Sequence, residues 1–369
     1  MRLPLLLLLG LWIGQSSAQQ PRIAFPFTQG WEGADAAYSL PLGADRYLWL
    51  FGDTFVGPPD DALRKHILAM PRNSIGIADC VPEKRCNLRY FWSKMGTNTP
   101  RAFFDTGTEE WFWPLDGFVW KDKLYILLSR FQAKGEGAFG FQNIGVTLAT
   151  IANFKDSPEQ WKIQYQPILA STSVMPGNSI VISGEYANCF TFVDRHGTRY
   201  TALTRIPLKE LKNAALSSGH WQYLSANGSW KSWKTATLPD DTKHVISAGY
   251  TEFTVRYHPA EKRWLAVMPA NILEGRGLYS TAPAPEGPWS EPQTLYRYPE
   301  MQPGNANYTK NVFCYADKEH PELESPGSLV FTYACNSFVL SEVTTNPKLY
   351  YPIVVTMPMA QINPQIETK

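Results

Sequence analysis

The chain has 369 residues, of which 44% are hydrophobic and 14% aromatic, so it is long enough to bury a sizeable core and is not a disordered sequence. Its formal net charge is only +1, which excludes a partner held by bulk electrostatics, such as nucleic acid or an anionic membrane surface. The many Trp, Tyr and Phe residues suit both the core of an all-β domain and a surface on which sugar rings stack.

The N-terminus predicts a signal peptide. Arg2 precedes an apolar run, residues 3–13, that is shorter than the roughly 20 residues needed to cross a bilayer. Ser16 and Ala18 place small residues before a cleavage site, so we expect residues 1–18 to be removed and a single domain over residues 19–369. The protein is therefore expected to be secreted or periplasmic, monomeric, and free of the membrane after cleavage.

Five cysteines follow the predicted signal peptide. Cys80 and Cys86 bracket a short polar loop, which in an oxidising compartment predicts a local disulfide. Cys314 and Cys335 flank a hairpin-like segment and could pair across two strands, which would leave Cys189 single. Because no cysteine has a CxxC partner or a histidine at ligand spacing, a zinc site is not expected.

One pattern recurs five times along the chain. Each copy begins with a polar residue, continues into an apolar strand, turns, and returns as a second strong strand. In chain order the predicted strand pairs cover residues 33–53, 113–131, 175–206, 249–271 and 307–336. Third-strand candidates follow at 72–78, 142–149, 275–282 and 350–357, and fourth-strand candidates at 88–94, 161–169 and 293–298. One amphipathic stretch, residues 207–216, predicts a helix between blades.

The polar residues that lead these copies define the predicted fold. They are Asp35, Asp116, Asn178, Glu252 and Asn311. Their average separation is about 70 residues, which fits a four-stranded blade. We therefore predict an all-β, five-bladed β-propeller. A pair of β-sandwiches is the alternative, but it does not explain why a polar residue returns at the head of each strand pair.

The innermost strands of a propeller line its central channel, so their first residues should converge at one mouth. Asp35, Asp116 and Glu252 are expected to meet there, and like charges held together raise at least one pKa. A protonated acid beside an ionised carboxylate is the pair that glycoside hydrolysis requires. Asp53, at the end of an apolar strand, is a fourth candidate. Each of these acids could instead cap a turn or face solvent on a strand.

A second group offers donors, amides and ring faces for a ligand rich in hydroxyl groups. These predicted substrate-binding residues are Arg72, Asn73, Trp113, Asn178, Tyr250, Asn305 and Tyr308. The near-repeats MPRNS and MPGNS within this group could equally be a shared turn. The sequence has no GxSxG elbow, P-loop, HExxH or GxGxxG motif, and its six histidines are scattered, so no metal site is predicted.

Several segments together resemble the five-bladed propeller glycoside hydrolases, in particular an endo-D-arabinanase-like branch long known as a domain of unknown function. The segments are GWEGADAAYSLPLGADRYLWLFGDTF, MPRNSIGI, WPLDG, MPGNSI, GYTEFTVRY, GPWSEPQTLY, HPEL and FTYACN. The resemblance implies an exported enzyme that hydrolyses furanoside or related linkages in arabinan-like oligo- or polysaccharides. It matches Asp35 to the first-blade acid. It matches Asp116 to a second-blade Asp that orients the site and tunes its acids. An enzyme of this kind is expected to require no cofactor, and a structural calcium ion is compatible with the resemblance.

The resulting hypothesis is a secreted glycoside hydrolase with Asp35 as base or nucleophile, Glu252 as acid, and Asp116 tuning both. One departure from the family pattern is that Asn178 stands in the third blade, where such enzymes often carry their acid. A non-catalytic glycan-binding propeller is the main alternative, and a protein-interaction scaffold is a third.

Overall fold

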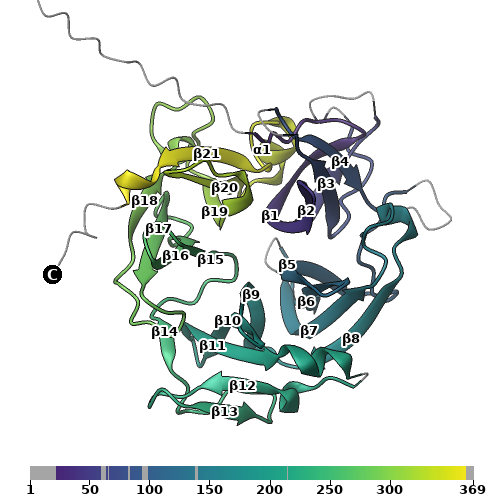
Figure 1. The fold of residues 1–369 in the computed structure, drawn as a ribbon. Coiled ribbons are helices and arrows are strands. Elements are labelled where there is room, and N and C mark those ends of the chain that lie inside the picture. Colours follow the sequence, from purple (N-terminus) through teal and green to yellow (C-terminus); the bar gives the residue numbers. More distant parts are fainter. Residues whose placement is uncertain are drawn as a thin grey trace, which may run out of the picture.

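The structure is a computed structural model that describes residues 22–362 apart from 60–63, 65, 82–83, 94–98, 138–139 and 214. Its strands form five antiparallel sheets arranged as blades around one axis (Figure 1). This arrangement confirms the predicted all-β, five-bladed β-propeller. Within the described ranges, no helix has the length and apolar character needed to cross a membrane. The predicted signal peptide lies outside these ranges and stays a prediction.

The first two blades are four-stranded meanders in which each strand pairs with the next. Blade 1 contains β1 (Trp31–Gly43), β2 (Arg46–Val56), β3 (Ser74–Asp79) and β4 (Asn87–Phe91). Blade 2 contains β5 (Trp111–Trp120), β6 (Lys123–Ala133), β7 (Phe141–Ile151) and β8 (Ile163–Leu169). Strand β2 is buried over almost its whole length because neighbouring blades cover both of its faces, which explains its continuous apolar sequence.

Blade 3 is larger than its neighbours. It contains β9 (Val174–Ser183), β10 (Tyr186–Arg195), β11 (Thr198–Pro207), β12 (Trp221–Leu224), β13 (Trp230–Trp233) and β14 (His244–Ile246). The helix predicted at residues 207–216 is wrong: among its described residues the structure has the 3-10 helix η2 (Leu208–Lys212) and no α-helix. Pro207 and Asn213, on either side of η2, are both extended, so the helical backbone stops at each of them.

Blades 4 and 5 complete the ring (Figure 1). Blade 4 contains β15 (Thr254–His258), β16 (Arg263–Pro269), β17 (Arg276–Ala282) and β18 (Gln293–Arg297). Blade 5 contains β19 (Val312–Glu319), β20 (Ser328–Ser337) and β21 (Ile353–Pro358), with the helix α1 (Leu340–Thr345) after β20. The remaining 3-10 helices are η1 (Pro158–Gln160), η3 (Ser218–His220), η4 (Pro299–Met301), η5 (Pro321–Leu323) and η6 (Met359–Gln361).

The contact between the first and last blades does not use a shared strand, because β1 to β4 form one sheet and β19 to β21 another. A buried arginine, Arg64, bridges this seam instead. Its guanidinium donates to backbone carbonyls of Glu32 in blade 1 and of Val343, Asn346, Leu349 and Tyr350 in blade 5. Side-chain hydrogen bonds at this point therefore replace the strand pairing that would otherwise close the ring.

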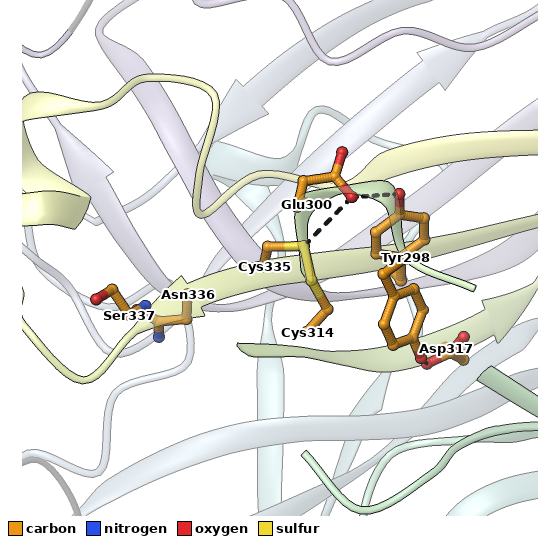
Figure 2. The surroundings of a disulfide bond; sticks show 8 residues. Tyr298, Glu300, Cys314, Asp317, Cys335, Asn336 and Ser337 are labelled. Atoms are coloured by element: carbon orange, nitrogen blue, oxygen red, sulfur yellow. Dashed lines mark hydrogen bonds between the residues drawn. A yellow bond between two sulfur atoms is a disulfide. The ribbon is translucent and has the colours of Figure 1, made fainter. Parts of the chain in front are cut away.

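Both predicted disulfides are confirmed. Cys80 pairs with Cys86, Cys314 pairs with Cys335, and Cys189 is buried and free. Figure 2 shows the second disulfide, which joins directly opposed residues of β19 and β20. Glu300 lies beside it, with a carboxylate oxygen 3.9 Å from Sγ of Cys335.

The innermost strands carry β-bulges at their acidic residues. The register shifts around Asp35 in β1, around Asp116 in β5 and around Asp317 in β19. In β1 the two residues after Asp35, Ala36 and Ala37, have φ angles of 68° and 58°. A bulge re-aims the side chain at its position, so one backbone device recurs at the acid of three blades.

Candidate active site

Three acidic residues gather at the end of the axis where the innermost strands begin, which we call the leading end. Asp35 lies in β1, Asp53 in β2, and Glu252 two residues before β15. The prediction that Glu252 lies inside a strand is wrong, since β15 begins at Thr254. The charges of Glu252 and Asp53 both act on the carboxyl group of Asp35, so these three predicted site residues are brought together.

The carboxyl group of Asp35 is held by two phenols. The hydroxyl of Tyr315 donates to Oδ2 at 2.6 Å, and that of Tyr350 donates to the same oxygen at 3.2 Å. Burial, then the charges of Glu252 and Asp53, raise the pKa of Asp35 to about 8, against the smaller opposing effect of the two phenol hydrogen bonds. Asp35 therefore holds a proton at neutral pH.

Glu252 has a different environment from that of Asp35. Its Oε1 lies 3.3 Å from Nζ of Lys318, a fully buried lysine whose Nζ is also 4.3 Å from the ring centroid of Tyr38. Asn178 fixes the backbone beside Glu252, because its Nδ2 donates to the carbonyl oxygen of Thr251 at 2.7 Å. Asn178 is itself fully buried, so in this structure it positions the Glu252 loop rather than facing solvent.

Asp53 joins blade 1 to blade 2 at the leading end. Its Oδ2 lies 3.0 Å from Nη1 of Arg72, and its Oδ1 accepts a hydrogen bond from Nε1 of Trp113 at 2.9 Å. Burial raises the pKa of Asp53, although the Arg72 charge opposes this effect. The structure thus brings together three predicted site residues, one acidic and two from the proposed binding group.

An aromatic cluster surrounds Trp113. Its ring centroid lies 4.4 Å from that of Phe131 and 4.8 Å from that of Phe141, and Trp111 packs edge-on at 5.9 Å. The guanidinium of Arg72 lies over the Trp111 ring at 4.5 Å from its centroid. Trp111, Trp113 and Phe141 are partly exposed, so aromatic side chains and a cation lie beside Asp53.

Asp116 belongs to a separate network. Its side chain is fully buried, and its oxygens accept from the backbone nitrogens of Gly117 and Ile180, each at 2.8 Å. Nη1 and Nη2 of Arg256 both lie 3.2 Å from Oδ2. These contacts join blades 2, 3 and 4, so the Asp116 carboxylate has a structural role. The tuning role predicted for Asp116 stays a prediction.

The other predicted binding residues make contacts with groups other than Asp35. Asn73 is fully buried and uses both polar atoms of its amide on the backbone of Phe104 and Phe112. Oδ1 of Asn305 accepts from the backbone nitrogen of Asn307 at 2.8 Å. Tyr308 is 40% exposed in the same loop, and Tyr250 packs against a core cluster of blades 3 and 4. Their binding roles stay predictions.

The polar residues that blade 5 contributes were not predicted from the sequence. Asn311, expected to lead that blade, precedes β19 and donates to Glu342, whereas Tyr315, Asp317 and Lys318 occupy the axial part of the strand. Burial raises the pKa of Asp317 to about 7, and its Oδ2 accepts from the hydroxyl of Tyr298 at 2.6 Å (Figure 2). The charged pair in ADKE was the available signal, because charges in a buried inner strand require partners.

The blade count, the axial acids and the bulged inner strands define the class as a five-bladed β-propeller with an acidic axial site. The chain belongs to the family described as a domain of unknown function (DUF5005), whose profile matches residues 24–352. A comparison with curated proteins found no match.

Solved structures match this chain at low sequence identity, and the match with a TM-score above 0.5 supports a shared fold. A candidate hydrolase from Bacteroides ovatus is 17% identical, with a TM-score of 0.71 over 93% of this chain and 89% of that one. The GH43_1 enzyme from Xanthomonas citri, complexed with xylotriose, is 12% identical, with a TM-score of 0.46 over 92% and 89% of the two chains. An α-L-arabinofuranosidase from Podospora anserina, in complex with cellotriose, is 11% identical, with a TM-score of 0.46 over 92% and 96%.

Proposed function

We propose that this protein is a glycoside hydrolase that uses Asp35 and Glu252 as its pair of carboxyl groups. The observation that carries the proposal is the pair of carboxyl groups at the leading end, with Asp35 held by the hydroxyls of Tyr315 and Tyr350 and Glu252 facing Lys318. Burial raises the pKa of Asp35 to about 8, which is consistent with this pair. A neutral carboxylic acid beside an ionised carboxylate can protonate a leaving oxygen while the carboxylate acts at the anomeric carbon.

The environments of the two groups favour a definite division of roles. Asp35 is the proton donor, because it holds a proton at neutral pH and its Oδ2 is fixed by Tyr315 and Tyr350. Glu252 is the second carboxyl group, because its Oε1 lies 3.3 Å from Nζ of Lys318 at the same end of the axis. This assignment reverses the roles that were expected for the two residues from the sequence.

The bond changes follow from these roles. As the glycosidic C–O bond breaks, the proton of Asp35 moves to the leaving oxygen. Glu252 then either removes a proton from the attacking water or itself bonds to the anomeric carbon, according to the separation of the carboxyl groups around the bound sugar. Water returns the missing proton to the site at the end of the reaction.

The surroundings of the acids support a sugar substrate. Trp111, Trp113 and Phe141 present partly exposed rings, and Arg72 adds a donor beside them. Rings of this kind stack on the apolar faces of sugars, while donors bind their hydroxyl groups. We propose arabinan-like furanosides or related oligo- and polysaccharides as substrates. The two disulfides support an oxidising compartment, so we further propose a secreted or periplasmic, monomeric enzyme.

Product release from a panel of arabinans, arabinogalactan, fructans and xylans tests the proposal. Wild-type protein should cleave one class, and Asp35→Asn and Glu252→Gln should each lower kcat by about 1,000-fold or more while binding is kept. Asp122→Asn is the matched control, because its side chain is 93% exposed on blade 2 and activity should not change. Binding of a panel member by wild-type protein without any cleavage would instead favour the non-catalytic glycan-binding propeller.

A further inference from the structure

A second polar cluster lies further along β19 than the Asp35 site. Tyr315 of this strand contacts Asp35, whereas Glu319, at the end of the strand, faces His258 at the end of β15. Nε2 of His258 is 2.7 Å from Oε1 of Glu319. Glu324, which follows η5, completes the group, and one ligand atom from each of the three side chains lies within 4.8 Å of the others.

The Glu319 carboxylate has one ion-pair neighbour, His258, and no hydrogen bond of suitable geometry. Its side chain has no exposed surface, and neither of its oxygens has a hydrogen-bond partner. Nε2 of His258 also lacks a hydrogen bond with suitable geometry, despite its short distance from Glu319. A buried carboxylate without hydrogen bonds is costly, so the protein interior at this point favours a cation.

Other acidic side chains surround this carboxylate. Glu324 lies within ligand distance of Glu319, and a buried oxygen of Glu322 lacks a hydrogen-bond partner. Arg256 is close enough for its charge to interact with Glu319, but its guanidinium is engaged by Asp116. Among the described residues, no hydrogen bond or ion pair joins this arginine to Glu319, while Glu324 accepts a hydrogen bond from the backbone nitrogen of Val330 at 3.1 Å.

We propose that His258, Glu319 and Glu324 bind one divalent first-row transition cation, such as Zn²⁺ or Mn²⁺, between blades 4 and 5. One imidazole nitrogen and two carboxylates form a mixed nitrogen and oxygen set that suits these ions. Calcium, for which the family resemblance left room, prefers six to eight oxygen ligands. Ligand atoms around such an ion lie about 3.3 Å apart, since each bond is about 2.1 Å long, so the cluster needs only small side-chain movements.

The expected consequence is a link between two blades that is independent of the chemistry at Asp35. His258 ends the inner strand of blade 4, and Glu319 ends that of blade 5. An ion that binds the folded protein but not the unfolded chain stabilises it in proportion to the logarithm of the free ion concentration. Metal binding and glycan hydrolysis can therefore fail separately.

Titration calorimetry on chelator-treated, full-length protein tests the proposal with Zn²⁺, Mn²⁺ and Ca²⁺ as separate probes. Wild-type protein should bind one equivalent of Zn²⁺ or Mn²⁺, and its Tm should rise with that ion. His258→Gln and Glu324→Gln should each raise the Kd at least tenfold, and Glu319→Gln should do the same if it folds. Glu261→Gln is the matched control, because its charge acts on His258 from outside the cluster, and its Kd should stay within twofold of wild type.

Two results would overturn the proposal. One is that wild-type protein binds neither Zn²⁺ nor Mn²⁺ stoichiometrically, whether or not it binds Ca²⁺. In that case the positive charge beside Glu319 would come from a protonated His258. The other is unchanged binding by folded His258→Gln and Glu324→Gln, which would place the ion elsewhere.

Discussion

The hydroxyl of Tyr315 in the last blade donates to Oδ2 of Asp35 in the first blade at 2.6 Å. This contact crosses the seam of the propeller at the proposed acid. Because the Tyr315 hydrogen bond lowers the pKa of Asp35, Tyr315→Phe should raise that pKa further. The alkaline limb of the pH–activity profile should move to higher pH, with kcat about tenfold lower. Tyr257→Phe, at a phenol that is 46% exposed, is the control and should leave the profile unchanged. An unchanged pH–activity profile for Tyr315→Phe would show that the Tyr315 hydroxyl does not influence the acid that limits activity.

The free energy of unfolding should fall as the pH rises, because the pKa of Asp35 is higher in the folded protein than in the unfolded chain. The pKa of Asp35 is about 8 in the folded protein against 3.8 for an ordinary aspartic acid side chain, so between these values the folded state binds a proton that the unfolded state lacks. This contribution is fully present below about pH 4 and is lost as the pH rises through about 8. Asp35→Asn removes the dependence and should raise Tm at pH 7 by about 2 °C or more while abolishing activity. Calorimetry from pH 5 to 8.5 checks this, and parallel curves for the two proteins would contradict it.

Replacement of Asp116 should affect stability more than the pH profile. Asp116→Asn removes the carboxylate that faces Arg256 and weakens bonds to two backbone nitrogens, so a buried guanidinium is left without its partner. The free energy of unfolding should fall by about 3 kcal/mol. Urea denaturation measures this change, with Asp79→Asn, at a half-exposed ion pair with Arg89, as a control that should stay within about 0.5 kcal/mol of wild type. A stable Asp116→Asn protein with a shifted pH profile would instead support the tuning role.

Arg64 should hold the ring closed. Arg64→Leu removes five hydrogen bonds from the guanidinium to backbone carbonyls of blades 1 and 5, and should lower the free energy of unfolding by about 3 kcal/mol. Hydrogen exchange should increase first in residues 343–350, whose carbonyls Arg64 binds. Arg89→Leu, on the outside of blade 1, should change stability by about 0.5 kcal/mol at most. Uniform exchange across the blades would argue against a weak seam.

The blades could be predicted because strand pairs and turns leave local signals at a regular spacing. Residues 33–53 and 113–131, for example, coincide closely with β1–β2 and β5–β6. The residue that leads the fifth blade was predicted wrongly, since Asn311 precedes β19 and the bulge near Ala316 lets the strand continue to Glu319. The helix expected at 207–216 is wrong although Leu208, Leu211 and Leu216 pack against the core, because the backbone is extended at Pro207 and again at Asn213.

The site was only partly predictable for a related reason. Asp35 and Glu252 were predicted because each leads a repeated strand pair, and Asp53 because it ends an apolar segment. Arg72 and Trp113 were predicted only because they offer a donor and a ring face. Tyr350 was not, because it reaches Asp35 from a loop 315 residues away, and no local pattern reports such a contact. Burial also separates residues that look alike in sequence: Asn73 and Arg72 are neighbours, but the amide is fully buried and the guanidinium is partly exposed.

The proposed mechanism depends above all on the proton of Asp35, and infrared difference spectroscopy detects that proton without a known substrate. Spectra of wild-type protein minus Asp35→Asn, recorded from pH 5 to 9.5, isolate the carboxyl band of this residue. A protonated carboxyl band should be present at pH 7 and should disappear as the pH rises through about 8. An Asp35 carboxyl that is already ionised at pH 7 would contradict the mechanism and remove Asp35 as the proton donor.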